Sequence, residues 1–189
     1  MKTPWQYAES GTEHAHQVAL FQWCAIARLW GVNAANDPLS YTTRMTAEPN
    51  IASDCIPNLQ WLHAIKNAGH GDAVRGNHSR AEGVKAGVPD IFFPVPQWGE
   101  THEAPGAAEM TCAGLYIELK RPKNFVVMNG RRGGKTEAGR VSDAQIKWRD
   151  YLKSAGYAVE VCFGWEAARD TILNYLGVSC HGGKGLPQV

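Results

Sequence analysis

The spacing of apolar residues in the first third of the chain predicts one helix followed by an irregular segment. Apolar residues recur at helical spacing within residues 12–30, and Gly31 ends the run. Residues 32–58 are rich in Asn, Pro, Ser and Thr, so we expect a long excursion with little regular structure there. The short apolar run at 59–65 fits either a helix or a buried strand.

Short apolar runs farther along the chain predict three strands separated by polar segments. The strands are expected at 89–93, 115–119 and 157–163. The polar segments 97–113 and 121–141 are expected to be loops.

Two further helices complete the predicted pattern. Ser142 and Gln145 have the spacing of a capping box that opens a helix, and a last helix is expected over 165–176. This order of elements predicts an α/β fold with a central mixed β-sheet flanked by α-helices. We expect a single domain over residues 1–177 and a frayed, Gly-rich tail over 178–189.

Composition narrows the class of protein. No run of 18 apolar residues exists and the N-terminus lacks an apolar core, so we expect neither a membrane span nor a secretory signal. The five cysteines are odd in number, widely spaced and without a CxxC pair, which indicates reduced thiols in a cytoplasmic protein rather than a disulfide framework.

Charge is concentrated in one segment of the chain. The net charge is only +1, but residues 120–140 hold seven basic residues and one acidic residue, Glu137. This segment therefore carries +6 and the remainder −5. A basic stripe on a mildly acidic body can follow the phosphates of a nucleic acid, although a solvated basic loop would have the same composition.

Three charged residues have the pattern of a metal-dependent active site. Asp90 opens one predicted strand, and after 27 intervening residues Glu118 and Lys120 lie on the next. Residues two apart on a strand project from the same face, with Cα atoms roughly 6–7 Å apart. Two carboxylates beside one ammonium suit Mg²⁺, which takes oxygen ligands and substrate phosphate oxygens. Such a metal activates water for phosphodiester hydrolysis, and Lys120 can orient that water or offset negative charge.

The alternative is a surface aspartate and a simple Glu–Lys neighbour pair, which is what an E-x-K sequence most often is when taken alone. Here the E-x-K lies on an apolar strand, where a buried carboxylate and ammonium are costly unless something employs them.

Three sequence blocks resemble the signature of the VRR-NUC nucleases, a family of the PD-(D/E)XK, restriction-endonuclease-like superfamily. The blocks are Gly87-Val88-Pro89-Asp90, Ile117-Glu118-Leu119-Lys120 and Ser142-Asp143-Ala144-Gln145. The resemblance covers roughly residues 60–176 and the first helix. It implies a restriction-endonuclease-like core and metal-dependent cleavage of DNA, often branched or flapped. The segments 32–58 and 97–113 are longer than a minimal member of the family implies, and we interpret them as insertions.

The resemblance also implies further site residues. Glu13 stands on the first helix where the family places another acidic active-site residue, although it could instead complete a capping box with Ser10. Gln145 matches the family's glutamine, although it too could serve only as a cap. We therefore expect catalytic roles for Asp90, Glu118, Lys120, Gln145 and Glu13. The metal, Mg²⁺ or Mn²⁺, is expected on Asp90, Glu118, Glu13 and the backbone carbonyl of Leu119.

The expected function is a structure-selective DNA endonuclease that resolves four-way, Holliday-type junctions as a homodimer in the cytoplasm of a bacterial or phage-infected cell. A junction has twofold symmetry, so an isologous dimer would supply two matched sites. The alternatives are a monomeric nuclease on flaps or linear duplex, a non-catalytic DNA-binding module and an interaction scaffold. We expect DNA contacts from seven basic residues: Lys85, Arg121, Lys123, Arg131, Arg132, Lys135 and Arg140.

Overall fold

A four-stranded mixed sheet lies at the centre of the protein. The computed structural model describes residues 2–43, 52–65, 78, 81–100, 108–128, 131–136 and 138–178. The strands are β1 (His63–Ala64), β2 (Ile91–Phe93), β5 (Leu115–Lys120) and β8 (Ala158–Phe163), in that order across the sheet. The pairs β1–β2 and β2–β5 are antiparallel, whereas the pair β5–β8 is parallel. The prediction of a mixed sheet is confirmed.

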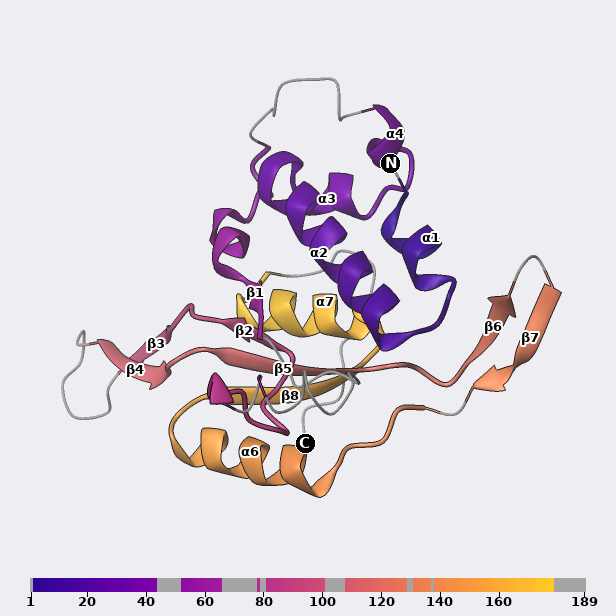
Figure 1. Cartoon of the computed structure of the whole chain (residues 1–189). Helices are drawn as coiled ribbons and strands as arrows, with labels where there is room; N and C mark the ends of the chain where they lie inside the picture. The colour runs from indigo at the N-terminus through magenta and orange to yellow at the C-terminus, as the bar shows by residue number, and fades with distance from the viewer. Residues whose placement is uncertain are drawn as a thin grey trace.

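Helices cover both faces of this sheet (Figure 1). On one face lie α2 (Glu13–Trp30) and α7 (Trp165–Tyr175), and on the other lies α6 (Asp143–Ser154). The chain needs a crossover between two parallel strands, and α6 supplies it between β5 and β8. All three helices begin and end within two residues of the predicted bounds.

The hydrophobic core is on the α2 and α7 side. Ile117 and Leu119 of β5 are fully buried there, together with Trp23 of α2 and Trp165 and Ile172 of α7. These large side chains leave water on one continuous apolar face, which is the main source of stability in a domain of this size.

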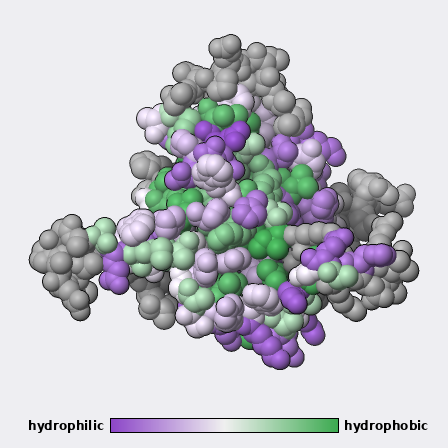
Figure 2. All heavy atoms as spheres, turned by 60° about the vertical axis from the view of Figure 1, so that its left-hand side comes forward, coloured by the Kyte–Doolittle hydropathy of each residue, from purple (hydrophilic) through white to green (hydrophobic). Residues whose placement is uncertain are grey.

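The α6 side of the sheet is less apolar. Leu152 is the buried residue of α6, and Figure 2 shows hydrophilic residues along the lower edge of the molecule, at the height of α6 in Figure 1. Across the two central strands, the rings of Phe92 and Tyr116 stack with centroids 4.3 Å apart, and Tyr157 meets Tyr116 edge-on at 5.3 Å. Aromatic cross-strand pairs stabilise this thinner layer.

Two polar segments that we predicted to be loops are hairpins instead. One holds β3 (Gln97–Glu100) and β4 (Ala108–Cys112), and the other holds β6 (Asn124–Met128) and β7 (Arg131–Thr136). Each forms its own two-stranded sheet. The polar or glycine-rich strands β3 and β7 give no hydrophobic pattern, whereas the apolar run at 125–128 in β6 is a strand signal that the prediction of a loop passed over.

The segment 32–58 is also more regular than predicted. It contains α3 (Val32–Ala35), α4 (Ser40–Thr43) and the start of the 3-10 helix η2 (Pro57–Trp61), which leads into β1. The run at 59–65 therefore contains both a helical turn and a strand.

The N-terminal region contains a short helix that the apolar pattern did not predict, α1 (Pro4–Ala8), with Thr3 and Gln6 in a capping box. Along the described residues, no helix combines the length and apolar character of a membrane span. The four described cysteines are free thiols, and all of the predicted tail at 178–189 except Val178 lies outside the described residues.

Candidate active site

The register of β2 on β5 brings Asp90 next to Glu118. Ile91 pairs with Ile117, so the residue before Ile91 lies opposite the residue after Ile117. The backbone N–H of Leu119 donates to Asp90 Oδ2 at 2.9 Å, and the N–H of Ile65 donates to the backbone carbonyl of Asp90 at 2.7 Å. Asp90 is thus fixed from both neighbouring strands, and its carboxylate contacts the backbone of β5.

Glu118 and Lys120 form a buried ion pair on the α6 face of β5. Lys120 Nζ lies 2.6 Å from Glu118 Oε1, and the two side chains are only 7% and 4% exposed. Burial raises the pKa of Glu118 to about 7; the hydrogen bond from Lys120 opposes this shift, and the nearby Asp90 carboxylate adds to it. A further positive charge beside Glu118 would therefore favour its ionised form near neutral pH.

Gln145 links the start of α6 to Glu118. Its Oε1 accepts from the backbone N–H of Ser142 at 2.8 Å, and its Nε2 donates to Glu118 Oε1 at 2.5 Å. The Ser142 hydroxyl in turn accepts from the backbone N–H of Gln145. From the sequence, helix capping and contact with the site are alternative roles for Gln145. In the structure its amide does both, because its oxygen and its nitrogen face different partners.

Glu13 lies close to Lys120 and is free of the capping role. The N-cap of α2 is Thr12, whose side chain accepts from the backbone N–H of Ala15, so the proposed Ser10 capping box is wrong. Glu13 is instead the first residue of the helix. Its carboxylate, half exposed, lies 4.0 Å from Lys120 Nζ. The structure thus places the Glu13 carboxylate near the same ammonium that Glu118 contacts.

The donor set suits a hard cation at Asp90 and Glu118. Glu118 Oε2 is buried and has no hydrogen-bond partner among the described residues, while Oε1 is occupied by Lys120 and Gln145. The N–H and C=O of a strand residue point to the same edge, so the Leu119 carbonyl is on the Asp90 side, past the end of β2. Mg²⁺ needs only one or two carboxylates when substrate oxygens and water complete its shell.

No group of three or more His, Cys, Asp or Glu side chains placed to hold a metal occurs among the described residues. Glu13 is therefore not drawn into a ligand set with Asp90 and Glu118, and its expected metal role gains no support from this geometry.

The predicted DNA-binding residues fall into two groups. Four of them have side chains that the structure describes, at least partly open to solvent: Lys85, Arg121, Lys123 and Arg140. Arg131, Arg132 and Lys135 lie on β7, with their backbone placed but their side chains outside the described part. Arg121 directly follows Lys120, the last residue of β5, so the basic segment 120–140 begins at the active site.

Two glycines lie near the site: Gly139, which was not singled out in the sequence, and Gly87, which begins the first of the three sequence blocks. A Cβ added at Gly139 would lie 2.8 Å from Glu13 Oε1 and 3.0 Å from Lys120 Cδ, so a side chain there would displace one of them. Gly87 has a φ of +86°, and a Cβ there would lie 2.6 Å from the backbone carbon of Ala144 in the first turn of α6. Close approaches of this kind have no signal in a single sequence.

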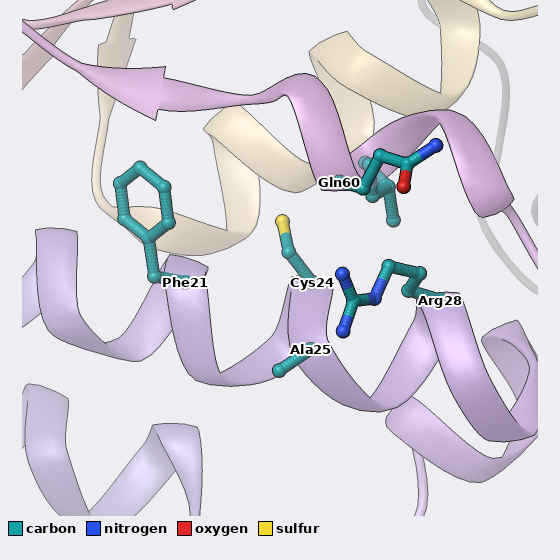
Figure 3. A pocket seen from close by; sticks show the side chains of 6 residues that line it. Phe21, Cys24, Ala25, Arg28 and Gln60 are labelled. Carbon is teal, nitrogen blue, oxygen red and sulfur yellow. The ribbon is translucent and has the colours of Figure 1, made fainter. Parts of the chain in front are cut away.

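Two hollows of the described surface lie away from these residues. One, of about 180 Å³, lies between α2 and η2 and is lined by Phe21, Cys24, Arg28 and Gln60 among others (Figure 3). It offers one guanidinium and no carboxylate. The other, of about 320 Å³, is bordered by β8 and α7. Neither has the pair of acidic ligands found at Asp90 and Glu118.

Comparisons with known proteins agree with the geometry. The family model described as "VRR-NUC domain" matches residues 36–165. A solved structure described as a VRR_NUC domain protein is similar over 88% of this chain and 89% of that one, with a TM-score of 0.50 and 17% sequence identity. At this identity the likeness shows the fold alone. No curated protein sequence matches the chain.

Proposed function

Because this chain belongs to the VRR-NUC family, whose domain is a nuclease acting on DNA, we propose that it is a metal-dependent, structure-selective DNA endonuclease that hydrolyses phosphodiester bonds. The observation that carries the metal dependence is the unpartnered, buried Oε2 of Glu118 next to Asp90 in the described structure. A buried carboxylate of this kind is costly unless a cation or proton joins it.

Asp90, Glu118 and the Leu119 carbonyl are the groups that would hold Mg²⁺ or Mn²⁺. When bound, the metal supplies a Lewis acid that offsets charge on the phosphate and makes water a better nucleophile. Gln145 keeps Glu118 Oε1 turned toward Lys120, so that Oε2 is left for the metal.

Lys120 is the group that provides positive charge to the reacting phosphate in the proposed site. Its ammonium is buried and fixed by Glu118, so it is preorganised before substrate binds. It can orient the attacking water or stabilise the negative charge that develops on the phosphate. Glu13, at 4.0 Å, helps to hold the ammonium in place.

We further propose a homodimer acting on four-way junctions. A single domain of this size supplies one site, whereas symmetrical cutting of opposing strands needs two, and a twofold dimer on a twofold junction provides them. The competing proposal is a monomeric nuclease on flaps or linear duplex.

The experiment that separates these proposals compares cleavage of a four-way junction, a flap and a linear duplex with Mg²⁺, Mn²⁺ or EDTA. Light scattering at micromolar concentration gives the oligomeric state. We expect a dimer that nicks the junction on opposing strands and is inactive in EDTA, with an Asp90→Asn preparation as the control for contaminating nucleases.

Other outcomes have definite meanings. A monomer that cuts all three substrates equally would replace the junction proposal with the general nuclease. Binding to DNA without cleavage in either metal would make the chain a non-catalytic DNA-binding module.

A further inference from the structure

The β6–β7 hairpin grows out of the strand that carries the active site. β5 ends at Lys120, β6 begins at Asn124, and after β7 the chain returns to α6, whose first turn carries Gln145. We propose that this hairpin is an arm that inserts into a groove of duplex DNA flanking the cleavage site. The inference rests on the proposed function and specifies how the substrate is held.

The base of the hairpin is fixed to the active site. The backbone N–H of Gly139 donates to the carbonyl of Arg121 at 3.0 Å, which closes the base of the hairpin. At the same point, Gly139 packs against the side chains of Lys120 and Glu13, so closely that a Cβ would not fit. The carbonyl of Lys120 also accepts from the N–H of Gly164 at 2.8 Å. DNA held by the hairpin is therefore held at a fixed offset from Lys120.

Among the described strands, the hairpin joins neither the central sheet nor the β3–β4 pair. Within the described residues β6 and β7 pair only with each other, and Figure 1 shows them extending past the Lys120 end of β5, away from the sheet. An isolated two-stranded hairpin is at best marginally stable in water. The feature therefore fits an element whose partner is outside the chain.

Charge identifies that partner as a polyanion. Three of the six residues of β7 are basic, Arg131, Arg132 and Lys135, and the segment 120–140 carries a net charge of +6. Such a concentration on a mildly acidic body favours a phosphate backbone over a protein surface.

The dimensions favour duplex over single-stranded DNA. A two-stranded β-ribbon fits the major groove of B-DNA. The six residues of β7 span about 20 Å at about 3.3 Å per residue, which corresponds to about six base pairs of duplex at about 3.4 Å each. Stable binding should thus need a duplex arm of about that length beside the cut.

The test varies the length of the duplex on each side of the cleavage site, with arms of about 4 or about 12 base pairs, shorter and longer than the ribbon. Binding is measured in EDTA by fluorescence anisotropy, and single-turnover cleavage with Mg²⁺. The wild-type chain is compared with the triple variant Arg131→Gln, Arg132→Gln, Lys135→Gln. The matched control removes three lysines elsewhere: Lys2→Gln, Lys147→Gln, Lys153→Gln.

We expect wild-type protein to bind tighter when the arm on one particular side is long. The triple variant should lose that preference, and its slope of log K against log salt should become shallower by about 0.9 for each phosphate that the protein no longer neutralises. The control should keep the preference. All three proteins should have the same unfolding temperature, because every substitution is made on the surface or on the hairpin.

Three results would overturn the proposal that the hairpin is a DNA-binding arm. The wild type could bind short and long duplex arms equally, the triple variant could keep the preference for a long arm, or the control could lose that preference to the same extent. Binding that depends on the length of the duplex, without cleavage in Mg²⁺ or Mn²⁺, would support the role of the hairpin and overturn the proposed nuclease activity instead.

Discussion

The two faces of β5 are built from alternate residues of one strand, and they differ in chemistry: one face is apolar and the other is charged. Ile117 and Leu119 point into the core beside α2 and α7 and are fully buried among apolar side chains. Glu118 and Lys120 point toward α6 and are almost as deeply buried, but as charges. Burial of the first pair stabilises the fold, whereas burial of the second costs free energy that their mutual attraction offsets only in part.

This difference locates a free-energy cost of folding at the buried charges of the α6 face. The buried Oε2 of Glu118 accepts no hydrogen bond in the described structure, and burial together with the nearby Asp90 carboxylate raises the pKa of Glu118 to about 7. A strand chosen for stability alone would carry apolar residues on both faces, as buried strands usually do. This cost fits the metal site that we propose on the α6 face of β5, and changes on the two faces should have different consequences.

The largest effect is expected from the carboxylates. Asp90→Asn and Glu118→Gln should each reduce cleavage to background, because each removes an oxygen ligand from the proposed metal. DNA binding should be preserved. Cleavage is measured on the junction under single-turnover conditions, with circular dichroism to confirm folding.

Glu160→Gln is the matched control for these variants. Glu160 is an exposed carboxylate on β8, directly beside Ile117 in the parallel ladder, and it contacts neither Asp90 nor Glu118 in the described structure. It should cleave at the wild-type rate. Near wild-type activity of Asp90→Asn or Glu118→Gln with Mg²⁺ would show that the metal site lies elsewhere.

Lys120→Ala should produce the next largest effect. The loss of one preorganised group that stabilises charge typically lowers turnover by about 10²–10³. Affinity for the metal should stay level or rise slightly, since a neighbouring positive charge is removed. Single-turnover rates measure the loss of cleavage, and a Mn²⁺ titration measures the affinity for the metal. The control is Lys147→Ala, which changes an exposed lysine of α6. A folded Lys120→Ala protein that no longer binds metal would assign this residue a different role.

The elements with a strong apolar period could be predicted from the sequence. α2, α6 and α7 were predicted to within two residues, as were β5 and β8, because their core contacts follow helical or alternating spacing. The hairpins at 97–112 and 124–136 were missed: β3 and β7 are polar or rich in glycine, and the apolar run of β6 lies inside a segment that its charge led us to treat as a loop. α1 was missed too, although Thr3 followed by Pro4 is a helix start signal.

The candidate site was predictable in composition but not in geometry. Strand alternation alone places Glu118 with Lys120. Their proximity to Asp90 depends on the register of β2 on β5, which 27 intervening residues leave open and only the family resemblance supplied. The close packing of Gly139 against Lys120 depends on how the chain returns from a hairpin that the sequence did not predict.

The smallest effect is expected on the opposite face, and it tests the comparison most directly. Ile117→Val removes one methylene group from a fully buried position next to Glu118 in sequence, but on the core side of β5. Such a change typically lowers the free energy of unfolding by about 0.5–1.5 kcal/mol. The cleavage rate per folded molecule should not change, since the strand backbone and the Asp90–Leu119 hydrogen bond remain. Urea unfolding and single-turnover cleavage measure the two quantities on the same preparation. If Ile117→Val slowed cleavage tenfold while costing little stability, the two faces of β5 would be coupled and the division between them would be wrong.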